Sequence, residues 1–268
     1  MYTGDFGGGD NIYDRLVGFA SSRGIPCAVA FGNHEPEDEK EREAVLNHFA
    51  SLPGCLNVRK DAETSKLPGA TNQIIPIYSS TDAGKKSAIL YLFDSHCDHH
   101  LPGYDRKNDW IKPEQVEWYV RHSRALTVEN GGVPYPALAF FHIPLLEYGE
   151  AWNDSRYKNM GWRIENEGCA PVNSGLFAAF LDCGDVKGVF CGHDHDPKDH
   201  PRAHIIYDRQ RREVKQRSVE MIDNGSFLTF GGYGARGGYR PLSDKMYRIV
   251  FTALPDRQKS VETIGFYP

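Results

Sequence analysis

The sequence predicts an α/β fold, because apolar stretches of strand length alternate with amphipathic stretches of helical length along the chain. Residues 25–31 are almost continuously apolar, as is typical of a strand buried on both faces. The helical stretches begin and end at residues typical of helix termini. A chain of 268 residues can bury a substantial core, and we expect a single domain over residues 1–268.

Four stretches have the spacing and the ends of helices, and they cover residues 11–23, 37–49, 113–126 and 175–181. Gly24 follows the first, in the position where glycine commonly ends a helix. The second starts with the acidic stretch 37–43, which suits a helix N-terminus, and stops before Pro53. Pro113 opens the third, which has apolar residues on one face.

The predicted strands are short apolar runs, at residues 25–31, 72–78, 88–93, 137–141, 186–191, 227–234 and 247–253. The turn-rich stretch 79–87 joins the second and third as a pair. Residues 197–226 form a charged insertion, which we interpret as a solvated surface. Its basic part, residues 209–217, is the alternative candidate for a contact surface.

Composition excludes some classes of protein. The formal net charge of -5 and the pI near 6.1 argue against a nucleic-acid partner. No apolar run approaches the roughly 18 residues that span a bilayer, so we expect no membrane association and a soluble chain without an export signal. The six cysteines are scattered, which favours buried thiols over disulfides or a zinc site.

Residues of metal-binding types follow four strand ends, namely the initial segment MYTG and the runs 25–31, 137–141 and 186–191. They are Asp5, Asn33, His34, His142, His193 and His195. The carboxyl ends of strands in an α/β sheet lie along one edge, so these side chains can converge. In the segment GHDHD, side chains two residues apart point the same way in extended backbone. Imidazole, carboxylate and amide oxygen together suit Zn, Mn or Fe. Each residue alone is more often structural, but all four positions in this order favour a metal site.

The order GD, GNHE, H and GHDH resembles that of the calcineurin-like metallophosphoesterases. The segments DWIKPEQVEWY, VNSGLFAAFLDCGDVKGVFCGHDHD and GGYGARGGY are similar to the purple-acid-phosphatase-related branch that includes the Dcr2-type phosphatases. The resemblance covers nearly the whole chain apart from residues 197–226. It implies a four-layer α/β/β/α sandwich with a two-metal site.

The resemblance also implies roles for particular residues. Asp5 would bridge two metal ions, Asn33, His142 and His193 would complete one site, and His195 would belong to the other. His34 would face the phosphate and assist catalysis. The implied reaction is hydrolysis of a phosphomonoester or phosphodiester by a metal-activated hydroxide. The expected substrate is a phosphorylated small molecule or a phosphoprotein.

The sequence departs from this family in two ways. The tyrosine ligand of the purple enzymes would stand three residues after Asp5, where this chain has Gly8, so we expect no ferric-tyrosinate centre. The family's first strand, which carries an Asp-x-His pair, has no counterpart before Asp5, so we expect an N-terminally truncated fold without its first strand and helix. The segment 94–96 is also Asp-x-His, but it comes too late in the order and is a weak substitute.

These departures leave three hypotheses. The chain is part of an active two-metal phosphatase, or a short form that binds one ion and hydrolyses slowly. The third hypothesis is a catalytically inactive relative that keeps the pocket for binding or regulation. Our interpretation is a metal-dependent phosphoesterase, with the inactive relative as the alternative.

Overall fold

A five-stranded sheet lies at the centre of the computed structural model, which describes residues 1–4, 12–99, 101–105, 107–154 and 167–193 and four later strands. Its strands, in spatial order, are β3 (Gln73–Tyr78), β4 (Lys86–Leu92), β5 (Ala137–Phe140), β6 (Val186–Cys191) and β8 (Phe227–Phe230). β3 is antiparallel to β4, and the other neighbours pair in parallel. The carboxyl ends of β4, β5 and β6 therefore lie at the same edge.

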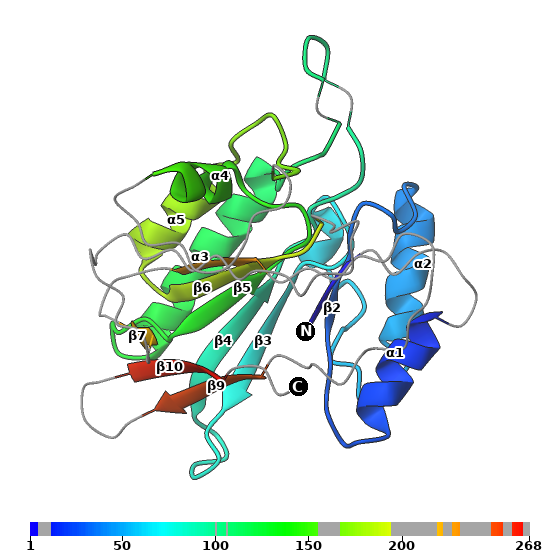
Figure 1. Cartoon of the computed structure of the whole chain (residues 1–268). Helices are drawn as coiled ribbons and strands as arrows, with labels where there is room; N and C mark the ends of the chain where they lie inside the picture. The colour runs from blue at the N-terminus through cyan, green and yellow to red at the C-terminus, as the bar shows by residue number, and fades with distance from the viewer. Residues whose placement is uncertain are drawn as a thin grey trace.

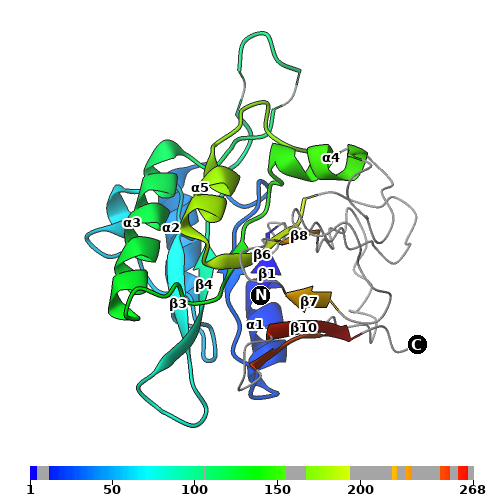
Figure 2. The same ribbon diagram turned by 90° about the vertical axis from the view of Figure 1, so that its left-hand side faces the viewer.

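The remaining described strands form two smaller sheets. β1 (Tyr2–Thr3) pairs in parallel with β2 (Val29–Ala30). The other small sheet is antiparallel and consists of β7 (Val219–Met221), β10 (Lys259–Ile264) and β9 (Arg248–Ala253). The segment between β4 and α3 (Pro113–Glu129) projects beyond these elements at the top of Figure 1 and of Figure 2.

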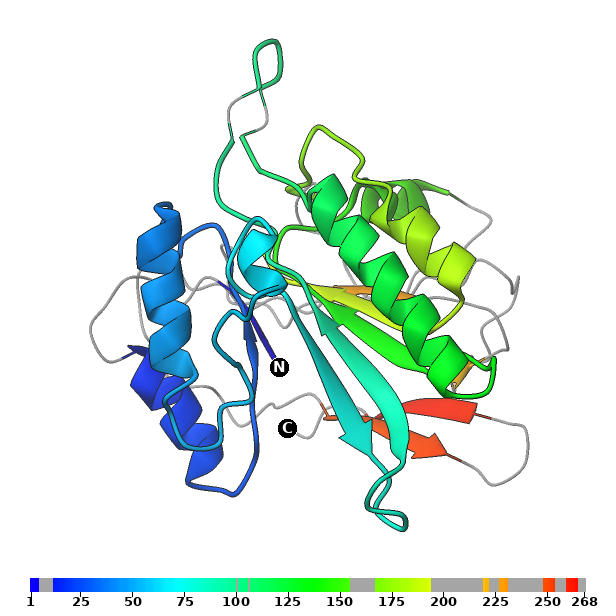
Figure 3. The same cartoon turned by 180° about the vertical axis from the view of Figure 1, so that it is seen from behind.

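Helices lie on two sides of this arrangement. α1 (Ile12–Ser21) and α2 (Glu39–Phe49) lie beside β2, whereas α3 and α5 (Leu176–Cys183) lie against the five-stranded sheet (Figure 3). α4 (Leu146–Asn153) belongs to the same core as α3 and α5, because its Tyr148 and Ala151 are part of that cluster. A short 3₁₀ turn, η1 (Thr64–Lys66), precedes β3. Within the described part of the chain, no helix has both the length and the apolar character needed to cross a bilayer.

Three hydrophobic clusters show how the layers are joined. The largest lies between the five-stranded sheet and α3, α4 and α5. A second joins Val29 and Phe31 to α1 and α2. The third contains Ala28, Ile75 and Leu92 and links the strand that carries β2 to β3 and β4. Because successive residues of that strand face opposite sides, its apolar run is buried on both faces. This order of helix, sheet, sheet and helix confirms the predicted α/β fold class.

Most predicted elements are present, with some differences in extent. The strand expected over residues 25–31 is regular only at Val29–Ala30, because its partner β1 has two residues. α4 was not predicted, since its sequence contains Gly149 and buries only Tyr148 and Ala151. β7 and β10 were also not predicted. Apart from β7, the charged insertion at 197–226 lies outside the described residues.

A buried carboxylate fixes α3 on the sheet. Asp185, which is 3% exposed, accepts hydrogen bonds from Ser123 Oγ at 2.7 Å, from Tyr91 Oη at 2.9 Å and from Tyr119 Oη. Burial and the neighbouring Asp185 charge raise the pKa of both tyrosines, so both hydroxyls stay protonated donors. Asp185 immediately precedes β6, and these bonds therefore set the position of the strand that leads to His193.

Candidate metal centre

Three loops at the carboxyl ends of strands bring polar side chains together. Asn33 lies in the turn after β2, His142 comes two residues after β5, and His193 comes two residues after β6. β5 and β6 are parallel neighbours, so their following residues lie side by side. The backbone amide of Gly192 donates to the carbonyl of His142 at 3.0 Å, which extends this pairing to the two histidines.

Three potential ligand atoms of these side chains lie close together. Asn33 Oδ1 is 3.1 Å from His142 Nε2 and 2.9 Å from His193 Nδ1. The two imidazole nitrogens are 3.2 Å apart, and the rings are nearly perpendicular at 85°. Two atoms bound to one ion at about 2.0–2.1 Å also lie roughly 3 Å apart. The spacing of the three atoms therefore fits a single bound cation.

The proton on His142 also suits a cation at this position. His142 is 1% exposed, and its Nδ1 faces the carbonyl oxygen of Thr3, which only accepts hydrogen bonds. In the neutral ring the proton is therefore on Nδ1, and Nε2 presents a lone pair. That lone pair faces Asn33 Oδ1, another acceptor, so a positive ion between the two would stabilise the contact.

The backbone at His193 is strained. Its φ of 78° lies in the left-handed region, which residues other than glycine rarely adopt. Such a conformation costs on the order of 1–3 kcal/mol and persists where the surrounding structure holds it, commonly at functional sites. Here it directs the ring of His193 toward Asn33 and His142.

A close backbone approach lies behind the ring of His142. Gly4, at the end of β1, has a φ of 79°, and a Cβ there would lie 2.5 Å from the backbone of Gly32 and from His142 Nδ1. The strand ends can converge only because this position has no side chain. The next residue in the sequence, Asp5, lies outside the described residues.

Replacing Gly4 with alanine is expected to weaken metal binding as well as stability, because the methyl group would displace Gly32 or His142. Gly24→Ala is the matched control, since Gly24 also has a positive φ (65°) but has open space around its Cβ position. Both variants carry the backbone strain, about 1 kcal/mol. Metal titration with Mn²⁺ and thermal melting of both check this: equal metal affinity in the two variants would contradict the expectation.

A buried ion pair positions the turn that carries Asn33. Arg42 of α2 donates to Asp94 Oδ1 at 2.8 Å and Oδ2 at 3.1 Å, and also to the carbonyl of Gly32 at 2.9 Å. Burial raises the pKa of Asp94, but the charge and hydrogen bonds of Arg42 outweigh it and hold that pKa well below its usual range. Glu35, which is 2% exposed, accepts from the amide of Gly32 and closes the turn.

The same contacts settle the role of the segment 94–96. Asp94 also accepts from the amides of Ala70 and His96, at 2.7 and 2.9 Å. The ring of His96 lies 2.9 Å from Gln115 Oε1, with its Nε2 engaged there. These two side chains bond to Arg42, the backbone and Gln115, so they are structural residues and do not replace the family's Asp-x-His pair.

Some of the predicted site residues are not placed with this cluster. Asp5 and His195 lie outside the described residues, so their ligand roles stay predictions. His34 is exposed and directly follows Asn33 in the turn. Within the described ranges, no group of three or more His, Cys, Asp or Glu side chains is arranged to hold a metal ion. The cluster found here has two histidines and an amide instead.

The model of the calcineurin-like phosphoesterase family matches residues 1–197, which include every predicted site residue. The chain belongs to the calcineurin-like phosphoesterase family. This match confirms the resemblance that the motifs indicated. The chemistry of the family is that of a metallophosphoesterase, which suits the nitrogen and oxygen donors of the cluster.

Several curated relatives match about 70–73% of this chain. Probable inactive purple acid phosphatase 29 of Arabidopsis thaliana is 34% identical over 211 residues, 73% of this chain and 54% of its own length. Probable inactive purple acid phosphatase 14 of the same plant is 32% identical over 70% and 52%. Phosphatase DCR2 of Saccharomyces cerevisiae is 33% identical over 73% and 35%.

The chain therefore spans about half the length of the plant relatives that it matches, and about a third of the yeast one. No solved structure matches it significantly. The branch to which these relatives belong, purple-acid-phosphatase-like and Dcr2, is the one that the motifs indicated.

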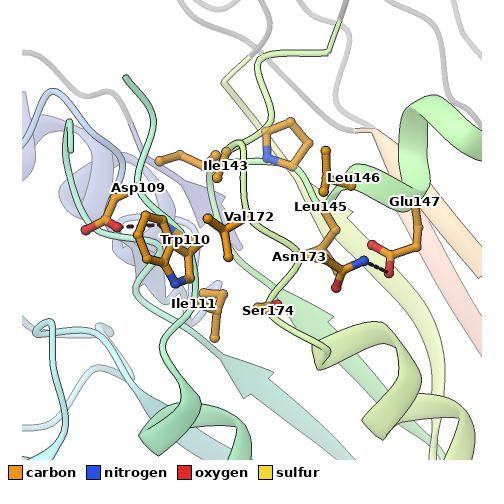
Figure 4. A pocket seen from close by; sticks show the side chains of 12 residues that line it. Asp109, Trp110, Ile111, Ile143, Leu145, Leu146, Glu147, Val172, Asn173 and Ser174 are labelled. Carbon is orange, nitrogen blue, oxygen red and sulfur yellow. Dashed lines mark hydrogen bonds between the residues drawn. The ribbon is translucent and has the colours of Figure 1, made fainter. Parts of the chain in front are cut away.

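A small pocket is lined in part by residues that directly follow His142 in the sequence (Figure 4). Its walls come from the segments 109–111, 143–147 and 170–174, and the first two directly follow Asn108 and His142. Most of the lining is apolar, with the indole of Trp110 on one wall. On the other side Asn173 donates to Glu147 Oε1 at 2.9 Å.

Two residues that the sequence reasoning missed contact the cluster. Asn108 Nδ2 is 3.0 Å from His193 Nε2, and Asp98 Oδ1 accepts from Asn33 Nδ2 at 3.4 Å. Neither residue follows an apolar strand, so the rule that found the candidate ligands did not apply to them. The one available signal was their position in the sequence, since Asp98 closely follows the segment 94–96 and Asn108 directly precedes DWIKPEQ.

Proposed function

We propose that this chain is a metal-dependent phosphoesterase in which Asn33, His142 and His193 bind a divalent ion. The observation that carries the proposal is the convergence of Asn33 Oδ1, His142 Nε2 and His193 Nδ1 within 2.9–3.2 Å of one another. The donor set of one amide oxygen and two imidazole nitrogens suits Zn, Mn or Fe. Asp5 and His195 would add ligands from the flanking segments, and a second ion with them.

When bound, such an ion lowers the pKa of a coordinated water and polarises a phosphoryl oxygen. The chain's own residues have three further tasks. The buried imidazole of His142, held by Thr3, orients its Nε2 toward the ion. His193 is oriented by its strained backbone. His34, exposed next to Asn33, would donate a hydrogen bond to the phosphate or to the leaving oxygen.

The substrate we propose is a phosphomonoester of a small molecule or a protein, with a phosphodiester as the alternative. The net charge of -5 does not favour a polyanionic partner. A general phosphomonoester such as p-nitrophenyl phosphate is therefore a suitable first substrate.

The second candidate function is binding without catalysis, by a protein that keeps the pocket but is catalytically inactive. The names of the two Arabidopsis relatives, which describe them as probable inactive phosphatases, favour this alternative. Activity measurements separate the two candidates, because both predict a folded domain and only the first predicts turnover.

The test is hydrolysis of p-nitrophenyl phosphate by the purified chain with Mn²⁺, Zn²⁺ or Fe²⁺, before and after chelation. We expect metal-dependent turnover that falls by more than about 100-fold in His193→Ala, since loss even of a residue behind a metal ligand costs about 10–100-fold. His48→Ala is the control, because His48 is exposed and pairs with Asp14 at the surface. Metal binding without any turnover in the unmodified chain would instead establish the inactive alternative.

A further inference from the structure

The loop between β4 and α3 closes on itself beside the candidate metal centre. Asp98 and Asn108 face each other in an isolated antiparallel bridge. The amide of Asp109 donates to the carbonyl of Cys97 at 3.1 Å, and the amide of His99 donates to the carbonyl of Lys107. These bonds hold the two arms of the loop together at its base, while its tip projects at the top of Figure 1.

Each member of this bridge contacts a different candidate ligand. Asp98 Oδ1 accepts from the amide nitrogen of Asn33 at 3.4 Å, and Asn108 Nδ2 is 3.0 Å from Nε2 of His193. Asn108 Nδ2 also donates to the carbonyl of Gly168, which holds the side chain of Asn108 next to the ring of His193. Residues from two different strand ends, Asn33 and His193, are thus held by one loop.

We propose that the Asp98–Asn108 bridge positions the metal ligands, with Asp98 orienting the amide of Asn33 and Asn108 orienting the ring of His193. This inference rests on the proposed function, because it requires the cluster to bind a metal ion. Both residues act through a ligand, and neither is a ligand itself.

The role of Asp98 follows from the chemistry of an amide. Asn33 offers one oxygen and one nitrogen, and only the oxygen can bind a cation. A carboxylate accepts hydrogen bonds and so attracts the nitrogen, which leaves Oδ1 on the side of His142 and His193. Without Asp98, the two orientations of the amide differ less in energy.

The role of Asn108 follows from the second nitrogen of an imidazole ring. In metal sites, the ring nitrogen that does not bind the ion has a hydrogen-bond partner that fixes the direction of the ring. The carbonyl of Thr3 occupies this place for His142, and Asn108 occupies it for His193. With Nδ1 of His193 on the ion, the ring proton is on Nε2, so Asn108 would pair with it through Oδ1 after its amide turns over from the Nδ2 contact seen here.

The return arm of the loop is anchored at the start of α3, which makes the bridge a firm support. Lys112 binds the carboxylate of Asp109, and its Nζ lies 3.6 Å from the centroid of the Trp110 ring. Asp109 is 8% exposed, and Gln115 Oε1 accepts from the amide of Lys112 at 2.7 Å. The position of Asn108 is therefore tied to a long helix of 17 residues.

The test is titration of the full chain with Mn²⁺ alone, followed by thermal melting with and without the metal. Asp98→Ala and Asn108→Ala are each expected to weaken Mn²⁺ binding by about 10–100-fold. Asp98→Asn keeps an oxygen acceptor for Asn33 and is expected to restore affinity close to that of the unmodified chain. A purely structural role would lower the melting temperature of the metal-free variants without changing their affinity.

Asn130→Ala is the matched control, because Asn130 Nδ2 also donates to a backbone carbonyl, that of Val133, but lies at the end of α3. It is expected to lose a similar hydrogen bond and to keep its metal affinity. Unchanged Mn²⁺ affinity in Asp98→Ala and Asn108→Ala would overturn the positioning role and leave the proposed function standing. Failure of the unmodified chain to bind Mn²⁺, Zn²⁺ or Fe²⁺ would overturn both.

Discussion

Replacing His142 with alanine is expected to abolish metal retention and to lower metal-dependent hydrolysis of p-nitrophenyl phosphate by more than about 100-fold. Nε2 of His142 is one of the three converging ligand atoms, and His142 is itself 1% exposed, so alanine would remove a buried donor from the ligand set. Metal content measured by mass spectrometry after dialysis, together with initial rates, checks this expectation.

The matched control for this variant is His96→Ala. His96 is another mostly buried histidine, 9% exposed, but its ring contacts Gln115 rather than the cluster. Both variants remove a buried imidazole and are expected to lower stability by a similar amount. Equal metal content in the two variants would contradict the assignment of His142 as a ligand.

The largest expected effect on stability comes from Arg42. Replacing it with methionine would leave the carboxylate of Asp94 buried, with no exposed surface and no counter-charge. We expect the free energy of unfolding to fall by about 3–5 kcal/mol, as measured by urea denaturation. Arg121→Met is the matched control, because the ion pair of Arg121 with Glu63 is exposed and such pairs contribute at most about 1 kcal/mol.

A double variant and a pH series separate the effect of the buried charge on stability from the effect of lost packing. Arg42→Met/Asp94→Asn removes both charges, so it should be more stable than Arg42→Met alone. In the unmodified chain the pKa of Asp94 is lower when folded than when unfolded. The ionised Asp94 therefore makes its full contribution to the free energy of unfolding at pH values above its pKa in the unfolded chain, which is about 3.9. That contribution is lost as the pH falls toward the lower pKa of the folded chain. A double variant that is no more stable than Arg42→Met would contradict this explanation.

The convergence of the candidate ligands was predictable because it depends on a regular feature. Parallel strands end at one edge of a sheet, and β5 and β6 were predicted from their apolar runs to within one residue. His142 and His193 follow these strands, so their proximity follows from the topology. Asn33 joins them through the parallel pairing of β2 with β1, whose end lies against Gly32 and His142.

The residues that support the site were not predictable in the same way. Arg42 and Asp94 are 52 positions apart, and Asp98 and Asn108 lie in a loop without apolar periodicity. Such contacts depend on how irregular segments fold back, which side-chain spacing does not encode. α4 was missed for a related reason, because only Tyr148 and Ala151 of its eight residues are buried.

The most direct test of the central claim is a crystal structure of the chain grown with Zn²⁺, with anomalous scattering recorded at the zinc edge. The account predicts a peak at about 2.0–2.2 Å from Asn33 Oδ1, His142 Nε2 and His193 Nδ1, whether or not a second peak accompanies it. A zinc peak only at another place in an otherwise unchanged structure, with no peak near these three atoms, would contradict it.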